Sequence, residues 1–373
     1  MNISDKVNAG VRSIKPYVPG RSVQEIIRAG QQADVVKMAS NENPLGASPA
    51  ALEAVRTTVP SVYQYPEVSC PDLRSTLGAR LGISEDELIV CNGADGVIYA
   101  LGMCLIAAGD ECIIPQITFP LYETVVRIMG GRVVTSPMRG YAIDLEEVLK
   151  RITRKTKLIW LCNPNNPTGT LVGADELEPF LAEVPDDVFV VHDEVYADFA
   201  PTDSFPDTVR LIREGRENLF LIRSFSKIYG LAGLRIGYGV GAEELIRWMY
   251  RVRPPFDVSV VAQAAAVAAI QDRSFYTKTL EVTAGGKEYL YRNLEALGFE
   301  YVPSHTNFIL IRVGMDETLL CDRLVEEGVI ARPAGGYQLP RHIRLTVGLP
   351  HQNQRLIEAL KRICEQRDDF ESS

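Results

Sequence analysis

The sequence predicts an α/β fold in which a mostly parallel sheet is covered by helices on both faces. From about residue 47 to residue 250, short runs rich in Val, Ile and Leu alternate with longer stretches whose apolar residues follow helical spacing. This alternation is typical of parallel strands joined by crossover helices. The chain has 373 residues, of which 46% are hydrophobic, so it is long enough to fill the core of such a sheet and to add a second domain.

Seven of the apolar runs are expected to be buried strands of one sheet. They are Glu87–Cys91, Glu111–Pro115, Arg132–Ser136, Leu158–Cys162, Val188–His192, Leu219–Arg223 and Arg235–Val240. Helical spacing is found between strands in segments such as Gly96–Ala107, Pro120–Met129 and Asp175–Ala182. In sheets of this kind, ligands bind at the carboxyl ends of the strands.

The last part of the chain has a different pattern, which predicts a smaller α+β domain. Its expected elements are a helical stretch Val258–Leu297, a strand Asn307–Val313, a helix Glu317–Glu327, a strand Ile343–Val347 and a closing helix Gln352–Glu365. We therefore expect a large domain over 46–255 and a small domain over 256–373. The loop-rich segment 1–45 is expected to pack with the small domain.

Charge, hydropathy and cysteine content argue against several functional classes. Lys and Arg total 39 and Asp and Glu total 48, so the net charge of −9 argues against nucleic acid as the main partner. No apolar run reaches the roughly 18 residues of a membrane-spanning helix, and residues 1–18 lack the apolar core of a secretory signal. The seven cysteines include no Cys-x-x-Cys pair, which fits reduced thiols in a cytoplasm. The four histidines are too scattered to indicate a metal site.

The most informative segment is 224–238, Ser-Phe-Ser-Lys-Ile-Tyr-Gly-Leu-Ala-Gly-Leu-Arg-Ile-Gly-Tyr. Its glycines do not form a dinucleotide fingerprint, and the chain contains no phosphate-binding loop of the Gly-x-x-x-x-Gly-Lys-Ser/Thr type. A polar, Gly-rich loop between two strands would explain an isolated Ser-Lys. Lys227 nevertheless follows a strand directly, beside hydroxyl groups and the guanidinium of Arg235, and this set suits a Schiff base with pyridoxal phosphate.

Two further motifs follow strands and therefore belong to the same edge of the sheet. Leu-Cys-Asn-Pro-Asn-Asn-Pro-Thr-Gly at 161–169 also fits an ordinary turn. Asp-Glu-Val-Tyr at 193–196 also fits the start of a helix, where acidic residues are favoured. The carboxylate of Asp193 is equally suited to pair with a pyridinium nitrogen, and Tyr196 to reach the phenolic oxygen of the same cofactor.

These three motifs together resemble those of the fold-type I, class II pyridoxal-phosphate aminotransferases. The resemblance extends from Pro16-Tyr17 to the segment Ile-Arg-Leu-Thr-Val-Gly at 343–348. Within that superfamily the chain most resembles the histidinol-phosphate aminotransferase branch, through Asn-Glu-Asn-Pro at 41–44, Tyr65-Pro66, Gly-Ala-Asp at 93–95 and Gly-Val-Ile-Ala-Arg-Pro at 328–333.

The resemblance implies roles for the residues around the cofactor ring. Lys227 would bind the cofactor covalently and carry the substrate proton. Asp193 would keep the pyridine nitrogen protonated, Asn166 and Tyr196 would bind the phenolic oxygen, and Phe119 would stack on the ring.

The resemblance also implies sites for the cofactor phosphate and for the substrates. The phosphate would be held by Gly93, Ala94, Asp95, Ser224, Ser226 and Arg235, with Tyr65 reaching it from the neighbouring subunit of a homodimer. The substrate-binding residues would be Arg344 for a carboxylate, Arg332 and Tyr17 for a distal phosphate, and Asn43. Arg332 also fits a solvated charge at a strand end, and Tyr17 and Asn43 fit ordinary loop residues.

The sequence departs from the pattern of the branch at several positions. Gly96 stands where glutamate is usual, so the helix start loses one charge near its dipole. Gln338 stands where glycine is usual and Arg341 where glutamate is frequent, and these two changes put substrate specificity in question. His192 stands where an apolar residue is common, and strand alternation directs its side chain away from Asp193, so we expect a core histidine.

The implied activity is transfer of an amino group between glutamate and the phosphorylated imidazole substrate of histidine biosynthesis. An aromatic amino-acid aminotransferase and a threonine-phosphate-type decarboxylase share the same motifs and remain alternatives. An aminotransferase-like sensing domain of a transcription regulator would need a DNA-binding module, for which the roughly 30 loop-rich residues before the large domain leave no room.

Overall fold

A computed structural model describes residues 2–16, 20–28, 30 and 34–371 of the chain. Its central sheet contains seven strands in the spatial order β2 (Leu88–Cys91), β10 (Gly237–Val240), β9 (Leu219–Ser224), β8 (Phe189–Asp193), β7 (Thr156–Cys162), β3 (Glu111–Pro115) and β4 (Arg132–Ser136). All neighbouring strands are parallel except β10, which is antiparallel to both β2 and β9. The predicted seven-stranded, mostly parallel sheet is therefore confirmed.

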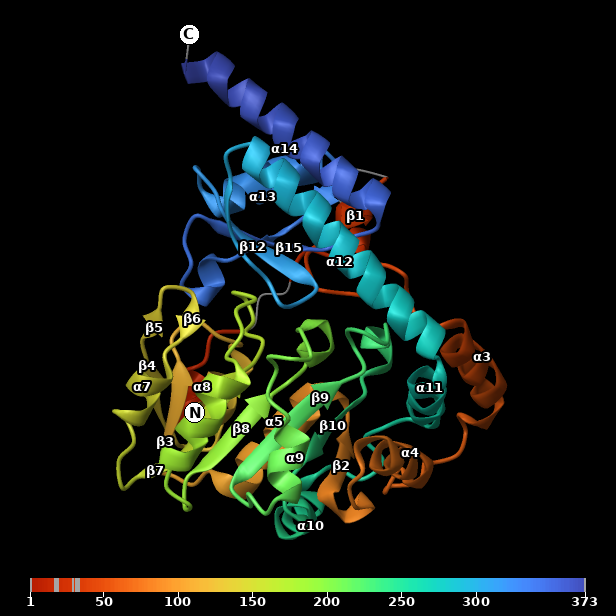
Figure 1. Cartoon of the computed structure of the whole chain (residues 1–373), viewed down its shortest axis with the longest axis vertical. Helices are drawn as coiled ribbons and strands as arrows, with labels where there is room; N and C mark the ends of the chain where they lie inside the picture. The colour runs from red at the N-terminus through yellow and green to blue at the C-terminus, as the bar shows by residue number, and fades with distance from the viewer. Residues whose placement is uncertain (1, 17–19, 29, 31–33, 372–373) are drawn as a thin grey trace.

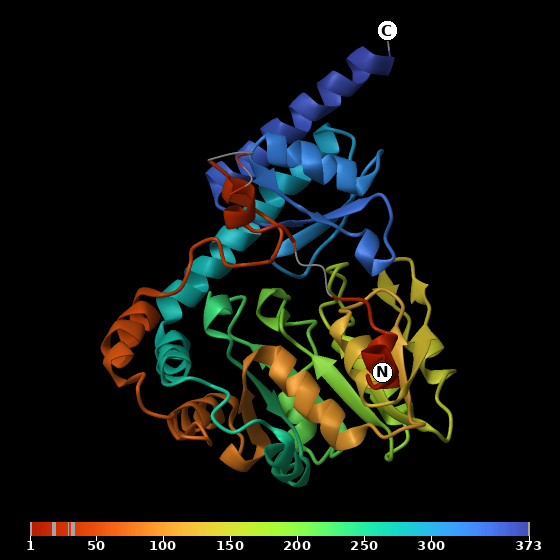
Figure 2. The same ribbon diagram turned by 180° about the vertical axis from the view of Figure 1, so that it is seen from behind.

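Helices cover both faces of this sheet, as Figure 1 and Figure 2 show. One face packs against α5 (Gly93–Leu105), α6 (Leu121–Ile128) and α10 (Glu243–Val252). The other face packs against α4 (Pro71–Leu81), α7 (Leu145–Leu149), α8 (Ala174–Glu183), α9 (Thr208–Arg213) and α11 (Val260–Gln271), with α3 (Pro49–Thr58) lying on α11. Strand residues alternate between the two cores, so that Val190 belongs to one and Val191 to the other.

The carboxyl ends of three adjacent strands bring the sequence motifs together. In the register of the sheet, Cys162 at the end of β7 lies beside Asp193 at the end of β8. Asp193 in turn lies beside Ile222 of β9, which ends two residues later at Ser224. The Asn-Pro, Asp-Glu and Ser-Lys motifs therefore start from neighbouring points on one edge of the sheet.

The small domain is built on an antiparallel sheet in the order β11 (Glu300–Val302), β12 (Phe308–Arg312), β15 (His342–Thr346) and β14 (Arg332–Pro333). Its core also includes residues of α12 (Arg273–Ala296), α13 (Glu317–Glu326) and α14 (Pro350–Glu371). The antiparallel strands and flanking helices agree with an α+β unit.

The helical stretch expected over 258–297 consists of two helices, separated at Asp272. The carboxylate of Asp272 accepts a hydrogen bond from the backbone N–H of Phe275 and so caps α12. The first of the two helices, α11, packs in the large-domain core, whereas the last turns of α12 pack in the small-domain core through Leu290 and Leu294. Packing therefore does not change from one domain to the other at the expected boundary 255/256. The change occurs along α12, which passes from the large domain to the small one (Figure 1).

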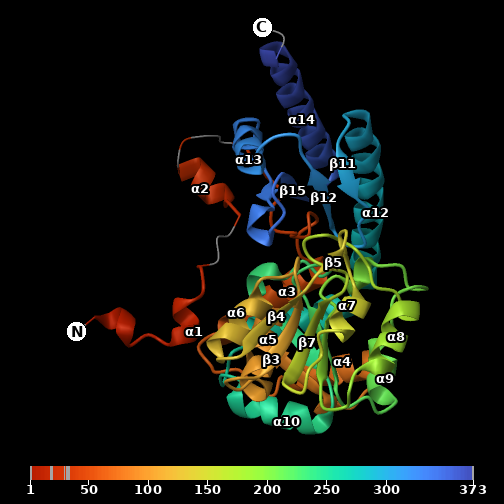
Figure 3. The ribbon, with the colours of Figure 1, turned by 90° about the vertical axis from the view of Figure 1, so that its left-hand side faces the viewer.

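The N-terminal segment contacts both domains. Helix α1 (Ala9–Arg12) packs on α6 of the large domain. Helix α2 (Val23–Arg28) contributes Ile26 to a cluster with Val325 and Ile330, and β1 (Val36–Lys37) pairs in parallel with β13 (Val329–Ile330). Figure 3 shows α1 beside the large domain and α2 beside the small one. The whole segment 1–45 was expected to pack with the small domain. In the structure α2 and β1 do so, whereas α1 packs on the large domain.

The remaining elements are short. They are the hairpin β5 (Met138–Arg139) and β6 (Ala142–Ile143) and the 3-10 turns Ile3–Asp5, Val59–Ser61, Glu85–Glu87, Ala197–Phe199, Ala232–Leu234 and Gly335–Tyr337. Within the described part of the chain, no helix has the length and apolar character needed to cross a membrane.

Candidate active site

A cavity of about 260 Å³ lies at the carboxyl ends of β7, β8 and β9, where the small domain faces the sheet. Twelve of the residues predicted to form the site line it: Ala94, Asp95, Phe119, Asn166, Asp193, Tyr196, Ser224, Ser226, Lys227, Arg235, Arg332 and Arg344. These residues come from segments spread over most of the chain, and folding gathers them in one place.

Lys227 follows β9 and lies inside the cavity. Its Nζ donates a hydrogen bond to the carbonyl oxygen of Ser40 at 3.3 Å and lies 5.6 Å from the ring centroid of Tyr196. Burial, together with the positive charge of Arg344, lowers the pKa of Lys227 to about 8. A useful fraction of this amine is therefore unprotonated near neutral pH, as a nucleophile requires.

Asp193, at the end of β8, is a buried carboxylate whose hydrogen-bond donors are both neutral. Its Oδ2 accepts a hydrogen bond from the hydroxyl of Tyr122 at 2.6 Å, and its Oδ1 accepts one from the backbone N–H of Val195 at 3.1 Å. Burial raises the pKa of Asp193 to about 6, although both hydrogen bonds oppose that rise. A cation in the cavity would stabilise the ionised carboxylate.

Tyr122 was not identified from the sequence. Its ring is fully buried and stacks on Trp160 at a centroid distance of 4.8 Å. Tyr122 lies three positions after Phe119, whose ring meets it edge-on at a centroid distance of 5.7 Å. Phe119 precedes α6, which begins at Leu121, so helical spacing did not link the two residues in the sequence.

Tyr196 and Asn166 lie on the side of the cavity nearest the small domain. The hydroxyl oxygen of Tyr196 accepts a hydrogen bond from Nδ2 of Asn41 at 2.9 Å. Burial raises the pKa of Tyr196 well above its usual range, so its hydroxyl stays protonated. Asn166 accepts a hydrogen bond from Arg344 at its Oδ1, at 2.6 Å, which leaves the NH2 end of the amide as a donor.

The N-terminus of α5 forms another end of the cavity, and it carries no side-chain cap. The amide of Asn92, the residue before the helix, bonds instead to the backbone of Asp257. The first N–H groups of α5, at Ala94 and Asp95, therefore suit an anion. Gly93 has a φ of +74°, and a Cβ there would lie 2.7 Å from Nη2 of Arg235, so only glycine lets this guanidinium pack over the helix start.

Two arginines of the small domain point toward the same cavity. Arg344, on β15, donates through Nη2 to the carbonyl oxygen of Ala39 at 2.9 Å and through Nη1 to the hydroxyl of Tyr337 at 3.3 Å. Its Nε is buried and has no partner among the described residues. Arg332, at the start of β14, also lines the cavity.

Two predicted residues lie outside the cavity, and a third is not among the described residues. Asn43 does not line the cavity, because its Nδ2 donates to the carbonyl oxygen of Ile228 and to Thr279, and its Oδ1 accepts from the backbone of Leu45. The prediction that Asn43 binds substrate is not supported by this position. Tyr65 is 82% exposed, outside the cavity of its own chain. Tyr17 lies outside the described residues.

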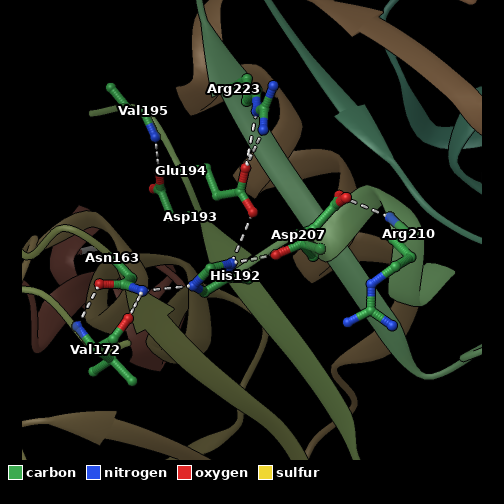
Figure 4. A network of polar contacts seen from close by, with 10 residues as sticks. Asn163, Val172, His192, Asp193, Glu194, Val195, Asp207, Arg210 and Arg223 are labelled. Atoms are coloured by element: carbon green, nitrogen blue, oxygen red, sulfur yellow. Dashed lines mark hydrogen bonds and ion pairs between the residues drawn. The ribbon is translucent and has the colours of Figure 1, made fainter. Parts of the chain in front are cut away.

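A second polar network lies on the opposite face of the β8 end, and Figure 4 shows it. Glu194 accepts hydrogen bonds from Nε and Nη2 of Arg223, at 2.9 and 2.7 Å, and lies 2.9 Å from Nδ1 of His192. Burial alone would raise the pKa of Glu194, but Arg223 and His192 outweigh it and hold the pKa at about 2.

The same network fixes the tautomer of His192. The backbone N–H of Val172 donates to Oδ1 of Asn163, and the carbonyl oxygen of Val172 accepts from its Nδ2. Nδ2 of Asn163 also lies 3.0 Å from Nε2 of His192, so Nε2 must accept and the proton lies on Nδ1. His192 is fully buried and bonds away from Asp193, as expected for a core residue.

The sequence departures at Gly96, Gln338 and Arg341 do not line the cavity. Gln338 and Arg341 both adopt positive φ, 64° and 58°, in the loop that follows Tyr337. Nε2 of Gln116, in the large domain, donates to Oε1 of Gln338 at 3.4 Å, across the two domains. At Gly96 a Cβ would already lie 3.0 Å from Cβ of Cys91, so the usual glutamate would require this helix start to shift.

The donor set of the cavity fits pyridoxal 5′-phosphate. The uncapped start of α5, with Arg235, Ser224 and Ser226, suits the phosphate, and Lys227 suits the aldehyde carbon. Asp193, buried without a cationic partner in its hydrogen bonds, suits a protonated ring nitrogen. One cavity thus supplies an anion site, an amine and a carboxylate of the kinds this cofactor needs.

Comparisons with known proteins agree with this geometry. The family model for aminotransferase class I and II matches residues 33–360. Histidinol-phosphate aminotransferase from Moorella thermoacetica is 43% identical over 358 residues, which cover 96% of this chain and 93% of that protein.

Similar folds are found among solved structures. The histidinol-phosphate aminotransferase from Sinorhizobium meliloti in complex with pyridoxal-5′-phosphate has a TM-score of 0.87 and 27% identity, covering 96% of this chain and 98% of that one. An aspartate aminotransferase from Thermus thermophilus with maleate has a TM-score of 0.82 and 25% identity, covering 96% of this chain and 99% of that one. Because enzymes named for different substrates share the fold, the fold alone does not select the substrate.

Proposed function

This chain belongs to the class I and II aminotransferases, and from that premise we propose that it is a pyridoxal-phosphate-dependent histidinol-phosphate aminotransferase of histidine biosynthesis. It would move an amino group between glutamate or 2-oxoglutarate and histidinol phosphate or imidazole-acetol phosphate. The observation that carries the proposal is the single cavity in which Lys227 and Asp193 lie together with Arg235, Arg332 and Arg344. The 43% identical relative of that name supports the choice of substrate.

The residues of the chain divide the work of catalysis. Bound pyridoxal phosphate supplies an electron sink for the electrons of the substrate Cα–H bond. Lys227 Nζ binds the cofactor before substrate arrives and then moves the Cα proton, a task for which a pKa of about 8 is well matched. The Asp193 carboxylate holds the proton on the ring nitrogen, and the hydroxyl of Tyr196 with the NH2 of Asn166 donates to the phenolic oxygen.

The arginines of the small domain account for two different anionic substrates. The guanidinium of Arg344, which lines the cavity, binds the substrate carboxylate of glutamate, for which its planar fork is suited. Arg332 binds the distal phosphate of histidinol phosphate. One site can then serve both half-reactions, because each substrate presents an anion to a small group of fixed cations.

We include a homodimer in the proposal, with Tyr65 reaching the phosphate of the partner's cofactor. Tyr65 stacks on Phe256 at a centroid distance of 4.6 Å, and the same stretch of sequence exposes the apolar side chains of Val59, Val62, Tyr63 and Val68. Exposed apolar clusters of this kind are typical of interfaces. The reduced, cytoplasmic setting expected from the odd number of cysteines belongs to the same proposal.

Substrate choice is tested by half-reactions of the cofactor-loaded enzyme in a stopped-flow spectrometer. Histidinol phosphate, phenylalanine and threonine phosphate are offered separately, and bleaching of the visible cofactor absorbance is recorded. Histidinol phosphate should bleach it fastest. Rapid bleaching by phenylalanine with none by histidinol phosphate would establish the aromatic aminotransferase instead, and release of CO2 from threonine phosphate would indicate the decarboxylase.

Arg332→Met sharpens this test, with Arg312→Met as its control. The change at Arg332 should slow the histidinol-phosphate half-reaction at least about tenfold, since a charge-assisted contact is lost, and spare the glutamate half-reaction. Arg312 pairs with Glu300 on the surface, so its loss should change neither rate.

Lys227→Ala should abolish turnover and the visible absorbance of the lysine-bound cofactor. Mixing this variant with Tyr65→Ala tests the dimer, because a mixed dimer contains one site with both defects and one site with neither. Activity should return on mixing. Retained transamination in Lys227→Ala alone would contradict the assignment of Lys227, and the absence of recovery on mixing would contradict a shared site.

A further inference from the structure

Asn41 lies in the cavity wall, and the proposed function assigns it no role. It belongs to the loop between β1 and α3, its φ is +56°, and its side chain is 2% exposed. Asparagine is among the few residues that tolerate this left-handed conformation. Glycine would satisfy the backbone equally well, so the buried amide itself requires an explanation.

The hydrogen bonds of Asn41 fix the orientation of its amide. The backbone N–H of Asn41 donates to Oγ1 of Thr346 at 2.9 Å, which leaves the hydroxyl hydrogen of Thr346 to donate to Oδ1 of Asn41 at 3.2 Å. Nδ2 is then the end that faces Tyr196, and it donates to the hydroxyl oxygen at 2.9 Å. In the reversed orientation Thr346 would have two donors directed at it and no use for its own hydrogen.

This orientation determines what Tyr196 can do. Because its hydroxyl oxygen accepts from Asn41, its single hydrogen is not used there and can be donated into the cavity. With the amide reversed, Oδ1 of Asn41 would take that hydrogen. We propose that Asn41 is a positioning residue that aims the hydroxyl hydrogen of Tyr196 at the phenolic oxygen of the cofactor, and this inference rests on the proposed function.

The anchors of Asn41 lie in the small domain, whereas Tyr196 belongs to the large one. Thr346 ends β15, and Nδ2 of Asn307, just before β12, donates to the carbonyl oxygen of Asn41 at 3.0 Å. The amide therefore reaches Tyr196 in this geometry only while the two domains hold their present arrangement. Asn41 thus links the donor strength of Tyr196 to the relative position of the domains.

The test is a pH titration of the visible absorbance of the cofactor-loaded enzyme, whose midpoint reports the protonation of the lysine-bound group. Donation from Tyr196 stabilises the deprotonated form and lowers this midpoint. Tyr196→Phe should therefore raise the midpoint by about one pH unit, a tenfold change. Asn41→Gly, which keeps the backbone conformation and removes the amide, should raise it by about half a unit, roughly threefold.

The decisive variant is the double substitution. Once Tyr196 is Phe, Asn41→Gly should produce no further shift, because the residue acts through the hydroxyl. All these changes are neutral, so the charged groups that line the cavity with Lys227 stay the same in every variant: Glu42, Asp95, Asp193, Arg235, Arg332 and Arg344. Thr346→Val, which releases the amide, should shift the midpoint in the same direction and serves if Asn41→Gly folds poorly.

Cys70→Gly is the matched control, since Cys70 is also buried with a φ of +51° but lies outside the cavity. It should leave the midpoint unchanged. The inference is overturned if Tyr196→Phe shifts the midpoint while Asn41→Gly and Thr346→Val do not, or if the shifts add in the double variant. Absence of any visible absorbance in the wild-type protein would instead contradict the proposed function.

Discussion

Asp193 and Glu194 are consecutive buried carboxylates, but they lie on opposite sides of the sheet and their pKa values shift in opposite directions. Asp193 faces the cavity, where neutral donors leave its charge uncompensated and its pKa rises to about 6. Glu194 faces the other way, where Arg223 compensates its charge, His192 adds a hydrogen bond, and its pKa falls to about 2. Burial is nearly the same for both, so the partners cause the difference.

The comparison distinguishes a ligand site from a structural support. A buried carboxylate that is paired with a cation of the protein needs no ligand to compensate its charge. A buried carboxylate that lacks such a cation raises the free energy of the folded protein unless a ligand provides the cation, and such groups mark functional sites. Asp193 is of the second kind, and a protonated pyridine nitrogen is the cation that the proposal provides.

The largest expected effect comes from Asp193→Asn. Loss of the charge should lower turnover roughly 100- to 1,000-fold, because a preorganised electrostatic contact to the ring is removed. The cofactor-free protein should be no less stable than the wild type at pH 7.5, since an uncompensated buried charge disappears. Steady-state kinetics and thermal unfolding measure the two effects. A large loss of stability would contradict the view that the charge of Asp193 is uncompensated in the cofactor-free protein.

Glu194→Gln should show the reverse pattern. Removing one partner of a buried pair leaves Arg223 uncompensated, and we expect a loss of about 3 kcal/mol in the free energy of unfolding. Turnover per folded molecule should stay within about threefold of wild type, since Glu194 does not line the cavity. Adding Arg223→Met should recover part of the stability. A variant that is stable but inactive would instead place Glu194 in the catalytic machinery.

The two carboxylates should also give opposite pH dependences. The folded-state pKa of Asp193 is raised from 3.8 to about 6, so the stability of the cofactor-free wild type relative to Asp193→Asn should fall as pH rises from about 4 to 6, by about 3 kcal/mol. The folded-state pKa of Glu194 is lowered from 4.5 to about 2, so its contribution is full above about pH 4.5 and is lost toward pH 2. Urea unfolding of the wild type, Asp193→Asn and Glu194→Gln between pH 2 and pH 6 measures how the free energy of unfolding changes with pH. The same pH dependence for both carboxylates would contradict the expected difference between them.

Among these substitutions, Tyr122→Phe should cause the smallest change in free energy. It removes one donor from Asp193 and should lower kcat about tenfold, with a loss of about 1 to 2 kcal/mol in stability. Tyr276→Phe is the control, because Tyr276 also donates to a carboxylate, Asp198, at 2.8 Å but lies outside the cavity. It should cost similar stability without changing kcat. Equal effects of both variants on kcat would show that Tyr122 has no particular link to the site.

Much of the large domain could be predicted because its strands are continuous apolar runs. All seven runs became strands of the central sheet, within two residues at each end. The packing of α11 could not be predicted, because an Ala-rich helix without clear amphipathic spacing does not reveal which core it joins. The contact of α1 with α6 could not be predicted from the sequence either, because the short helix α1 has no buried residue and so no apolar pattern.

The site divides in the same way. Motif residues such as Lys227 and Asp193 could be placed at the sheet edge, because each comes within four residues of the end of a predicted strand. Asn41 and Tyr122 were missed because their importance comes from one contact with a residue far away in the sequence, 155 positions for Asn41 with Tyr196 and 71 for Tyr122 with Asp193. Asn43 was predicted to bind substrate, whereas Asn41, two residues earlier in the same motif, is the amide that lines the cavity; the backbone path decides which of the two faces it.

The pairing of β1 with β13, and of Asn41 with Thr346, has a consequence for biosynthesis. Asn41 and Thr346 are 305 positions apart, so at about 5 to 20 residues per second a ribosome needs roughly 15 to 60 s between them. During that interval the strands that precede Lys227 leave the ribosome and can pair, while β1 still lacks its partner. A nascent chain stalled near residue 300 therefore carries Lys227 and Asp193, but neither Arg332 nor Arg344.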